Sequence, residues 1–464
     1  MTSIQSIALA DKRARAHEFL GHPTGLTVLF GTEMWERFSY YGMRALFVLY
    51  LTKYLLLPGH VEHVWGYPQI KASLEYFAGP MGVQPISSLL YGLYTGLVYF
   101  TPLPGGWLAD RVMGQKRVVM IGIVLMAFGH FMMAFETLLF PALFLLIIGV
   151  GIFKPNTTSQ VGSLYAPGDH RRDRAYSIFY VGVNVGAFLS PLVCGTLGEE
   201  VGWHYGFAAA GVGMLIALAV YRIGFNTLPE DELTKLKIAH EKGQKLTRDE
   251  WRAVIALIVL CIPLTLYWAC YEQQGNTIAL WASDNTDRTI DLLFWRGEIP
   301  VTWFQSFNPF MIFAFTPFVV GLWRRQASKG TEPNSIEKMV FGAFCMTAAN
   351  LIMAAAAMIA GAGGQASWLW LLCYFVILTV GELYLSPISL SLYSKVAPPQ
   401  ILSTMMAVNF IPNFLGGGFL QGWLGSYWSS MSKETFFLMI AAISALAGAV
   451  VWAFNRPLKP ILKE

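Results

Sequence analysis

The sequence predicts an all-α membrane protein, in which twelve transmembrane helices form two six-helix bundles and both termini are cytoplasmic. Three observations support this prediction. The 464 residues are 55% hydrophobic and only 13% charged, whereas a soluble globular protein has roughly 25% charged residues. The chain contains long apolar segments, and its basic residues concentrate in alternate loops between them. This composition excludes a cytosolic enzyme, a disordered regulator and a nucleic-acid binder.

Twelve apolar segments approach the length that a bilayer requires, about 20 residues. Six lie in the first half of the chain, near 26–57, 84–109, 117–139, 141–165, 175–198 and 204–225. Six more lie near 252–281, 304–324, 337–361, 367–395, 400–425 and 434–455. We therefore predict one bundle over 26–225 and a second over 252–455. The polar residues 226–251 are a cytoplasmic linker between them, and 1–25 and 456–464 are cytoplasmic ends.

The basic residues set the orientation, because cytoplasmic loops are enriched in Lys and Arg. With twelve spans, 24 of the 32 Lys and Arg residues lie on the side of the two termini. Five lie on the opposite side, namely Lys53, Lys71, Arg288, Arg296 and Lys433. The segment 58–83 on that side is expected to be an extended extracellular loop. The first 25 residues lack the pattern of a cleaved signal peptide. The sequence thus predicts a multi-pass protein of the cell (inner) membrane.

Seven charged residues lie inside the predicted spans, and each costs about 2.5–3.5 kcal/mol on insertion scales. They are Glu33, Glu36, Arg37, Arg44, Lys154, Glu272 and Glu382. At 100° per residue, the four charges of the first span share one arc of about 140° with Tyr40 and Tyr41. Met34, Trp35 and Phe38 occupy the other side. This pattern favours a helix that faces a polar cavity, although a self-neutralising ion-pair stripe between helices is the alternative.

The other intramembrane charges need partners or a polar surrounding. Lys154 precedes Pro155 in the fourth span and is predicted to pair with a first-span glutamate, unless it extends to the interface. Glu272 in the seventh span is expected to have a basic partner. Glu382 in the tenth span lies four residues before Ser386 on the same helix face. An unpaired glutamate there is either a proton site or an anionic site for a substrate amine.

Two pairs of neutral polar residues also share helix faces. Tyr180 and Asn184 lie in the fifth span, and Gln305 and Asn308 lie near the start of the eighth. Each pair is explained equally well as a hydrogen-bond clamp between helices. Together with the charges, these groups would suit a zwitterion with a carboxylate at one end and an amine at the other.

Several motifs of the chain resemble those of one family. Residues 33–42, EMWERFSYYG, resemble the ExxERFxYYG motif of the proton-dependent oligopeptide transporters, the POT family of the major facilitator superfamily. GGWLADRVMG at 105–114 resembles the family's first signature. FYVGVNVG at 179–186 is similar to the second, FYxxINxG, with Val183 for Ile. FKPN, EQQGN, QSFNP and GELYLSP lie in the expected spans and order, so the resemblance covers positions 33 to 387.

This resemblance implies the major facilitator superfamily fold and a symporter that imports di- and tripeptides with protons by alternating access. The residues that it implies for proton coupling are Glu33, Glu36, Arg37, Lys154, Glu272 and Arg44. It places the peptide carboxylate at Arg37, Arg44 and Lys154, and the amine at Glu382, Asn184 and Asn308. Tyr41 would line the substrate pocket together with Tyr94 or, as the alternative, Tyr99, and Ser386 is added because it shares the face of Glu382.

The resemblance implies no cofactor and no metal, with protons as the coupling ion. Its expected partners are a small peptide and the lipid bilayer, without nucleic acid, and the protein is expected to act as a monomer. The alternative is a proton-coupled carrier of the same fold for another small anion or amino-acid-like solute, such as nitrate. Glu382 favours a substrate with an amine. An enzyme is not expected, because HExxH, GxSxG, Walker A and CxxC motifs are absent.

Two features depart from the family pattern. Many bacterial members have two extra helices between the halves, and 226–251 is too short and polar for them. The second span contains no histidine in LYGLYTGLVYF, so the histidine proton site of the animal members is not expected. His130 in the third span is interpreted as a packed polar residue.

Overall fold

The computed structural model describes residues 18–19, 21–166, 169, 171–229, 246–292, 295–398 and 401–462. Helices make up most of this part of the chain, and the strands in it are short. The predicted all-α class is therefore confirmed. Most of the predicted linker, residues 230–245, and most of the predicted N-terminal segment, residues 1–17, lie outside the described residues.

The chain packs as two compact units, each of which combines segments distant in sequence. The first unit contains Met1–Met43, Thr101–Gly198 and Gly202–Lys237, as far as these are described. The second contains Arg44–Phe100, Glu199–Val201 and Ile238–Glu464, within the same limit. The second unit thus includes residues from both halves of the sequence. The division into bundles over 26–225 and 252–455 follows the sequence halves instead and stays a prediction.

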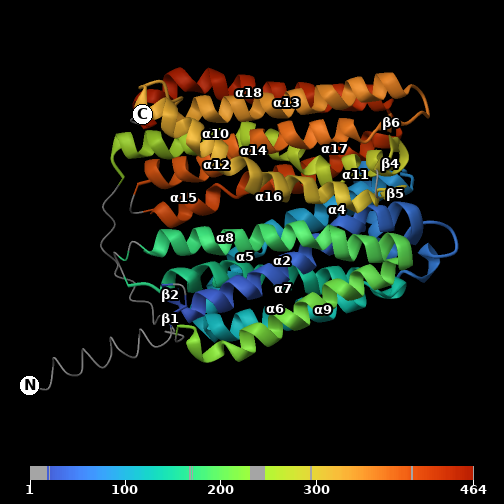
Figure 1. Cartoon of the computed structure of the whole chain (residues 1–464), viewed down its shortest axis with the longest axis horizontal. Coiled ribbons are helices and arrows are strands. Elements are labelled where there is room, and N and C mark those ends of the chain that lie inside the picture. Colours follow the sequence, from blue (N-terminus) through green and yellow to red (C-terminus); the bar gives the residue numbers. More distant parts are fainter. Residues whose placement is uncertain are drawn as a thin grey trace, which may run out of the picture. The chain divides into compact units, whose positions relative to one another are not determined.

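The first unit is a group of long helices (Figure 1). Helix α6 packs along α7 and α9, and α5 packs on α7. Its elements are β1 (Glu18–Phe19), β2 (His22–Pro23), the first part of α2 (Thr24–Tyr50), α5 (Pro102–Leu108), η3 (Ala109–Met113), α6 (Gln115–Met132), η4 (Glu136–Leu138), α7 (Leu139–Ser163), α8 (Arg171–Ser190), η5 (Pro191–Gly195), the start of η6 (Leu197–Val201), α9 (Trp203–Ile223) and η7 (Phe225–Thr227). Strands β1 and β2 pair antiparallel.

The second unit begins within α2 and continues with η1 (Leu51–Leu55), η2 (Val61–His63), α3 (Tyr67–Ala78) and α4 (Val83–Phe100). The later part contains α10 (Arg248–Tyr271), η8 (Glu272–Gly275), α11 (Thr277–Asp284), β3 (Thr286–Asp287), β4 (Thr289–Leu292), β5 (Trp295–Glu298), η9 (Val301–Ser306), α12 (Phe307–Ser328), α13 (Ser335–Ala360), β6 (Ala366–Ser367), α14 (Leu369–Val396), α15 (Leu402–Val408), α16 (Ile411–Phe414), η11 (Leu415–Leu420), α17 (Gln421–Gly425), η12 (Ser426–Ser429) and α18 (Lys433–Leu462). Helix α13 packs between α18 and α14, and α4 packs against η11 and α17.

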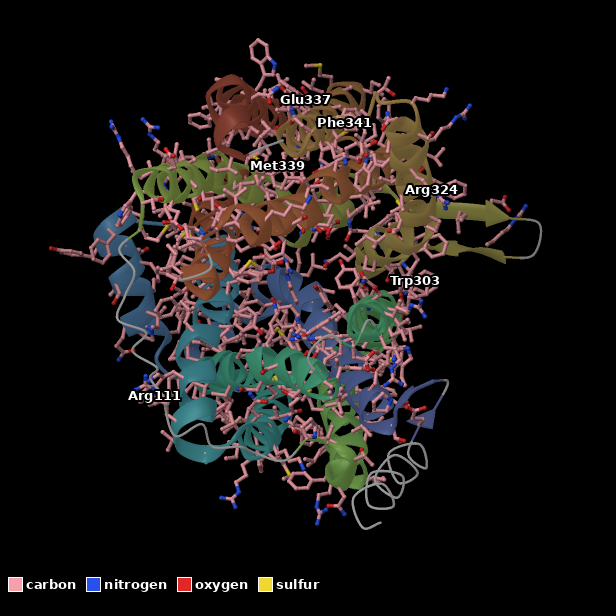
Figure 2. The ribbon with its side chains drawn as sticks, turned by 90° about the vertical axis from the view of Figure 1, so that its left-hand side faces the viewer. Arg111, Trp303, Arg324, Glu337, Met339 and Phe341 are labelled. Atoms are coloured by element: carbon pink, nitrogen blue, oxygen red, sulfur yellow. The ribbon has the colours of Figure 1, made fainter. Side chains whose placement is uncertain are left out.

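Local sequence explains where two of these helices begin. Thr247 precedes α10, and its hydroxyl accepts a hydrogen bond from the Glu250 backbone N–H at 3.2 Å. Asn334 precedes α13 and accepts from the Glu337 backbone N–H at 2.8 Å; Glu337 is labelled in Figure 2. In both cases the glutamate carboxylate also accepts a hydrogen bond from the backbone N–H of the capping residue. These reciprocal bonds satisfy N–H groups that have no partner inside the helix.

Nine helices of the described chain are long and apolar enough to cross a membrane by length and composition. Helix α2 is not among them, because its charged residues Glu33, Glu36, Arg37 and Arg44 exceed what such a segment tolerates. The predicted span 400–425 is broken into α15, α16, the π-helical η11 and α17. The predicted 84–109 span likewise divides into α4 and α5. A count of twelve transmembrane helices and the cytoplasmic position of the termini stay predictions.

The loops predicted outside the membrane contain regular structure. The segment 58–83 is not extended throughout, since it contains η2 and the twelve-residue helix α3. Strands β4 and β5 pair antiparallel, with Ile290 opposite Gly297, and project from the second unit (Figure 2). Arg296 Nε donates across this pair to Asp291 Oδ1 at 2.6 Å. Strand β3 pairs in parallel with β6.

Close packing of α5 on α7 gives a first prediction for stability. A Cβ atom at Gly105 would overlap the backbone carbonyl of Gly151, whereas a Cβ at Gly106 would meet its nearest atom, on Pro155, at 3.8 Å. We expect Gly105→Ala to lower the free energy of unfolding by about 1–3 kcal/mol, the usual cost of overpacking. Thermal unfolding in detergent measures it. The matched control Gly106→Ala should unfold like the unmodified protein, and equal melting temperatures for both variants would contradict the packing.

Candidate functional site

Three buried charges form a cluster on α2 in the first unit. Glu33, Glu36 and Arg37 are only 3%, 0% and 4% exposed. Arg37 Nη2 donates to Glu36 Oε1 at 2.7 Å, and Arg37 Nε donates to the other oxygen of Glu36. Arg37 Nε also lies 3.5 Å from Glu33 Oε1. The predicted charged face of this helix is therefore present, with one more carboxylate than cation among these three residues.

Helix α7 adds two groups to this cluster. Thr157 Oγ1 donates to Glu33 Oε2 at 3.1 Å. Lys154, about one turn earlier, is near enough to Glu33 to act on it electrostatically. The charge of Lys154 can offset the carboxylate that Arg37 leaves in excess. A direct ion pair between Lys154 and Glu33 stays a prediction.

A second group of charges lies in the second unit, where α2 meets η8 and α4. Arg44 Nη2 contacts Glu272 Oε2 directly as an ion pair. Arg44 Nε donates to Tyr91 Oη at 2.6 Å. Arg44 is 7% exposed, Glu272 1% and Tyr91 0%. Glu272 therefore has the basic partner that was expected for it, and this partner is Arg44.

Glycines permit this close approach. The residue after EQQ is Gly275, where a Cβ would overlap the Tyr91 hydroxyl. At Gly417 of η11 a Cβ would lie 3.0 Å from Glu272 Cγ. Because neither position carries a side chain, backbone can lie close to Tyr91 and Glu272 beside the Arg44–Glu272 pair. Buried in this way, the pair gains little screening from water.

The third group surrounds Glu382 on α14. Asn308 of α12 donates through Nδ2 to Glu382 Oε2 at 2.7 Å and to Thr379 Oγ1 at 3.1 Å. The Tyr271 hydroxyl of α10 also hydrogen-bonds Glu382. The partners that the structure describes for Glu382 are thus neutral. Its carboxylate can still take up a proton or pair with a cationic ligand, as the sequence suggested.

The remaining predicted site residues are less closely connected to these groups. Asn184 lies in the first unit and donates within α8 to the Tyr180 carbonyl at 3.0 Å. Tyr41 packs edge-on against Tyr40, with ring centroids 5.1 Å apart. Tyr94 packs against Phe47 at 5.6 Å. Ser386 is half-buried on α14, and its backbone carbonyl is 3.5 Å from the Ser389 hydroxyl. Substrate roles for these four residues stay predictions.

Sequence reasoning missed the neutral partners of the charges. Tyr91 lies three residues before Tyr94 in the same LYGLYTG run, and it is Tyr91 that contacts Arg44. Thr157 and Thr379 are short side chains one helical turn or less from Lys154 and Glu382. Their spacing was a usable signal, since residues three or four apart share a helix face. Helical periodicity alone could not show which of several residues on one helix face contacts the charged side chain.

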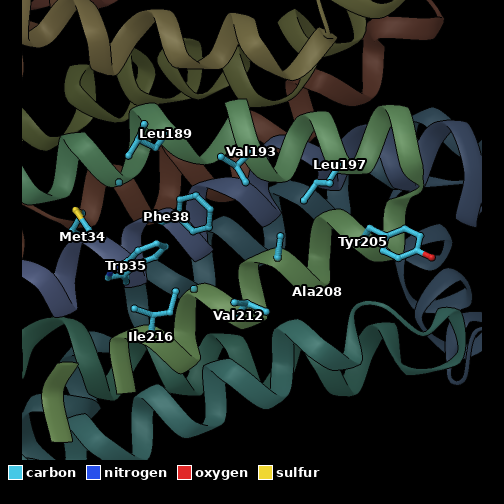
Figure 3. A pocket seen from close by; sticks show the side chains of 13 residues that line it. Met34, Trp35, Phe38, Leu189, Val193, Leu197, Tyr205, Ala208, Val212 and Ile216 are labelled. Carbon is cyan, nitrogen blue, oxygen red and sulfur yellow. The ribbon is translucent and has the colours of Figure 1, made fainter. Parts of the chain in front are cut away.

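The first unit also has an apolar cavity of about 530 Å³ on the other side of α2 (Figure 3). Its wall includes Met34, Trp35 and Phe38 of α2, which lie opposite the charged face, with Leu189 and Val212 from α8 and α9. None of its 13 lining residues is charged. This cavity therefore does not collect the residues predicted to bind a zwitterion.

Long apolar helices with buried ion pairs are typical of membrane transporters, in which charges inside the membrane mark a pathway for ions or substrate. A family model described as "POT family" (PTR2) matches residues 116–246 and 226–436. The "Di-/tripeptide transporter" of Lactococcus lactis subsp. cremoris is 30% identical over 96% of this chain and 98% of its own. "Peptide transporter YePEPT" of Yersinia enterocolitica is 31% identical, covering 96% of each chain. The chain belongs to the POT family, and its relatives are transporters.

Solved structures agree with this assignment. The crystal structure of a "peptide transporter POT in complex with sulfate" has a TM-score of 0.82 and 28% identity, covering 98% of this chain and 99% of that one. A "POT family transporter in complex with 5-aminolevulinic acid" has a TM-score of 0.80 and 26% identity, covering 95% and 98%. The described helices therefore have the fold of POT transporters.

Proposed function

We propose that this protein is a symporter that imports di- and tripeptides together with protons by alternating access. The observation that carries the proposal is Glu382, a half-buried carboxylate whose described partners are neutral. An anionic site of this kind suits the amine of a zwitterion. The relatives named for peptide transport support the choice of substrate. A nitrate carrier would have no use for such a carboxylate.

In this proposal, the two ends of the peptide have separate partners. Arg37, Arg44 and Lys154 attract the peptide carboxylate, and Glu382 with Asn308 receives the amine. Tyr41, Tyr94, Asn184 and Ser386 complete the proposed pocket. Charge-assisted hydrogen bonds of this type are roughly twice as strong as neutral ones. A peptide with both ends free therefore binds better than one with a blocked end.

Proton coupling is proposed to work by exchange of ion pairs. Protonation of Glu272 removes its attraction for Arg44 and frees the guanidinium. Protonation of Glu33 or Glu36 acts in the same way on Arg37 and Lys154, and deprotonation toward the cytoplasm restores the pairs and releases peptide. The membrane potential contributes about 2.3 kcal/mol per charge per 100 mV, and the pH gradient adds to it. No cofactor is required, and one chain suffices for the cycle.

The direct test is uptake of a labelled dipeptide into proteoliposomes with and without an inward proton gradient. We expect accumulation with the gradient and only slow equilibration after a protonophore is added. Uptake that is indifferent to both the pH gradient and the potential would contradict proton coupling. Uptake of nitrate but not of dipeptide would favour the anion carrier instead.

A second prediction concerns Lys154. Replacing it with alanine should reduce gradient-driven dipeptide uptake to background, because Glu33 then lacks the cation that offsets its charge. Exchange of internal for external peptide, which needs no net proton movement, should continue. Lys116→Ala is the matched control, since Lys116 is a buried lysine of the same unit that packs over Phe225. Normal gradient-driven uptake by Lys154→Ala would mean that this lysine only reaches the interface.

A further inference from the structure

A network of uncharged side chains begins next to the Arg44–Glu272 pair and has no role in the mechanism above. Its centre is Asn276, which follows η8 in the EQQGN motif. Asn276 Oδ1 accepts a hydrogen bond from Ser88 Oγ of α4 at 2.8 Å. Asn276 Nδ2 donates to Gln421 Oε1 of α17 at 3.2 Å. One amide thus joins three elements that are distant in the sequence.

Other side chains extend the network on both sides of Asn276. Gln273 Nε2 donates to the Gln421 carbonyl at 2.9 Å, and Thr277 Oγ1 donates to Gln273 Oε1 at 2.9 Å. On the α4 side, Gln84 Nε2 donates to the Gly425 carbonyl at 2.9 Å. These bonds fasten α4 and α17 to the chain segment that carries Glu272.

The network is buried, and the backbones around it are in close contact. Asn276, Ser88 and Gln421 are 0% exposed. A Cβ at Gly425 would overlap the Asn276 amide, and a Cβ at Gly92 of α4 would lie 2.6 Å from the Gly418 carbonyl. Such buried polar groups cost free energy whenever they lose their partners. Separation of α4 from α17 must break these bonds before water can replace them.

The ion pair and the network respond differently to protons. The charged and titratable groups described at Glu272 are Arg44 from α2 and, through Arg44, Tyr91 from α4. Gly417 of η11 adds only backbone there. Protonation of Glu272 can release Arg44. Amide and hydroxyl groups such as those of Asn276 and Ser88 do not titrate in the pH range in which a carboxylate takes up a proton. The contribution of the network to holding α4 on α17 therefore does not depend on the protonation state of its own side chains.

We propose that Asn276 is a positioning residue: it holds α4 and α17 on the segment of Glu272 and sets how much protonation is needed before these elements separate. The proposal rests on the transport function proposed above. Without Asn276, the segment should open before Glu272 is fully protonated. The same early opening should follow from removing the Ser88 hydroxyl, which donates to Asn276 Oδ1.

The test measures opening directly and uses no peptide. The five native cysteines are replaced, and Ser87→Cys places a reporter thiol on α4. Ser87 is 0% exposed and donates only within its own helix, to the Val83 carbonyl, among the bonds described. In full-length protein in liposomes, we expect Asn276→Ala to raise the alkylation rate of this thiol by a water-soluble maleimide threefold or more at neutral pH. After correction for the smaller thiolate fraction at acid pH, acidification should raise the alkylation rate by a smaller factor than it does in the parent.

Ser88→Ala should act in the same direction and provides a second variant if Asn276→Ala does not fold. Asn350→Ala is the matched control, because Asn350 is 1% exposed and donates to Met346 of its own helix; its alkylation rate should equal that of the parent. Unchanged alkylation in folded Asn276→Ala and Ser88→Ala would overturn the proposal. A parent protein that shows pH-dependent alkylation but moves no peptide would contradict only the proposed transport function.

Discussion

Replacing Arg44 with alanine is expected to abolish proton-driven peptide uptake and to lower the free energy of unfolding by about 3–5 kcal/mol, the cost of leaving a buried charge without its partner. Glu272 is 1% exposed and pairs with Arg44. Tyr91 would lose its donor as well. Uptake into proteoliposomes and unfolding in detergent measure the two effects separately.

The double variant Arg44→Ala/Glu272→Gln separates charge from packing. It should recover most of the lost stability, because a neutral amide replaces the unpaired carboxylate, but it should not recover proton-driven uptake. Lys53→Ala is the matched control: Lys53 and Asp284 lie 2.5 Å apart with side chains 40% and 41% exposed. Exposed pairs contribute about 0–1 kcal/mol. An Arg44→Ala variant as stable as the control would contradict the importance of the buried pair.

Replacing Glu382 with glutamine is expected to weaken binding of a free dipeptide about tenfold or more. Hydrogen bonds to charged groups contribute about 1.5–3 kcal/mol, and each 1.4 kcal/mol is a factor of ten in affinity. Glutamine keeps the size of the side chain and a carbonyl that can accept from Asn308. The loss should therefore reflect the charge. Equilibrium binding to the purified protein measures it.

The dipeptide itself provides a control for this experiment. A dipeptide with an acetylated amine should bind weakly and equally to the unmodified protein and to Glu382→Gln. Glu200→Gln removes an exposed carboxylate of the same unit and should leave binding of the free dipeptide unchanged. Unchanged affinity of Glu382→Gln for the free dipeptide would remove Glu382 from the amine site.

The charged part of the site could be predicted from sequence, because a charge inside an apolar segment is costly and must have a partner. Glu272 required a cation, and the family resemblance implied a role in proton coupling for Arg44 as well as for Glu272. The structure brings these two residues together. The cluster of Glu33 with Arg37 followed from helical spacing of four residues. Charges are rare in such a chain, so few pairings were possible.

The neutral part could not be predicted in the same way. Serine, threonine, tyrosine and amide side chains are frequent in these helices and need no charged partner. The contacts of Tyr91 with Arg44 and of Asn276 with Ser88 and Gln421 depend on how distant helices pack. Hydropathy also gives the length of an apolar segment but not its local geometry. The 400–425 segment, which contains Gly416–Gly418, therefore looked like one helix although it is several.

The most direct test of proton-coupled transport measures protons during peptide entry. Proteoliposomes that contain a fluorescent pH indicator start at equal internal and external pH, with the potential clamped by potassium and valinomycin. Adding external dipeptide should acidify the interior in step with labelled peptide uptake, and Glu272→Gln should abolish this acidification. Peptide entry at a normal rate without internal acidification would contradict coupling.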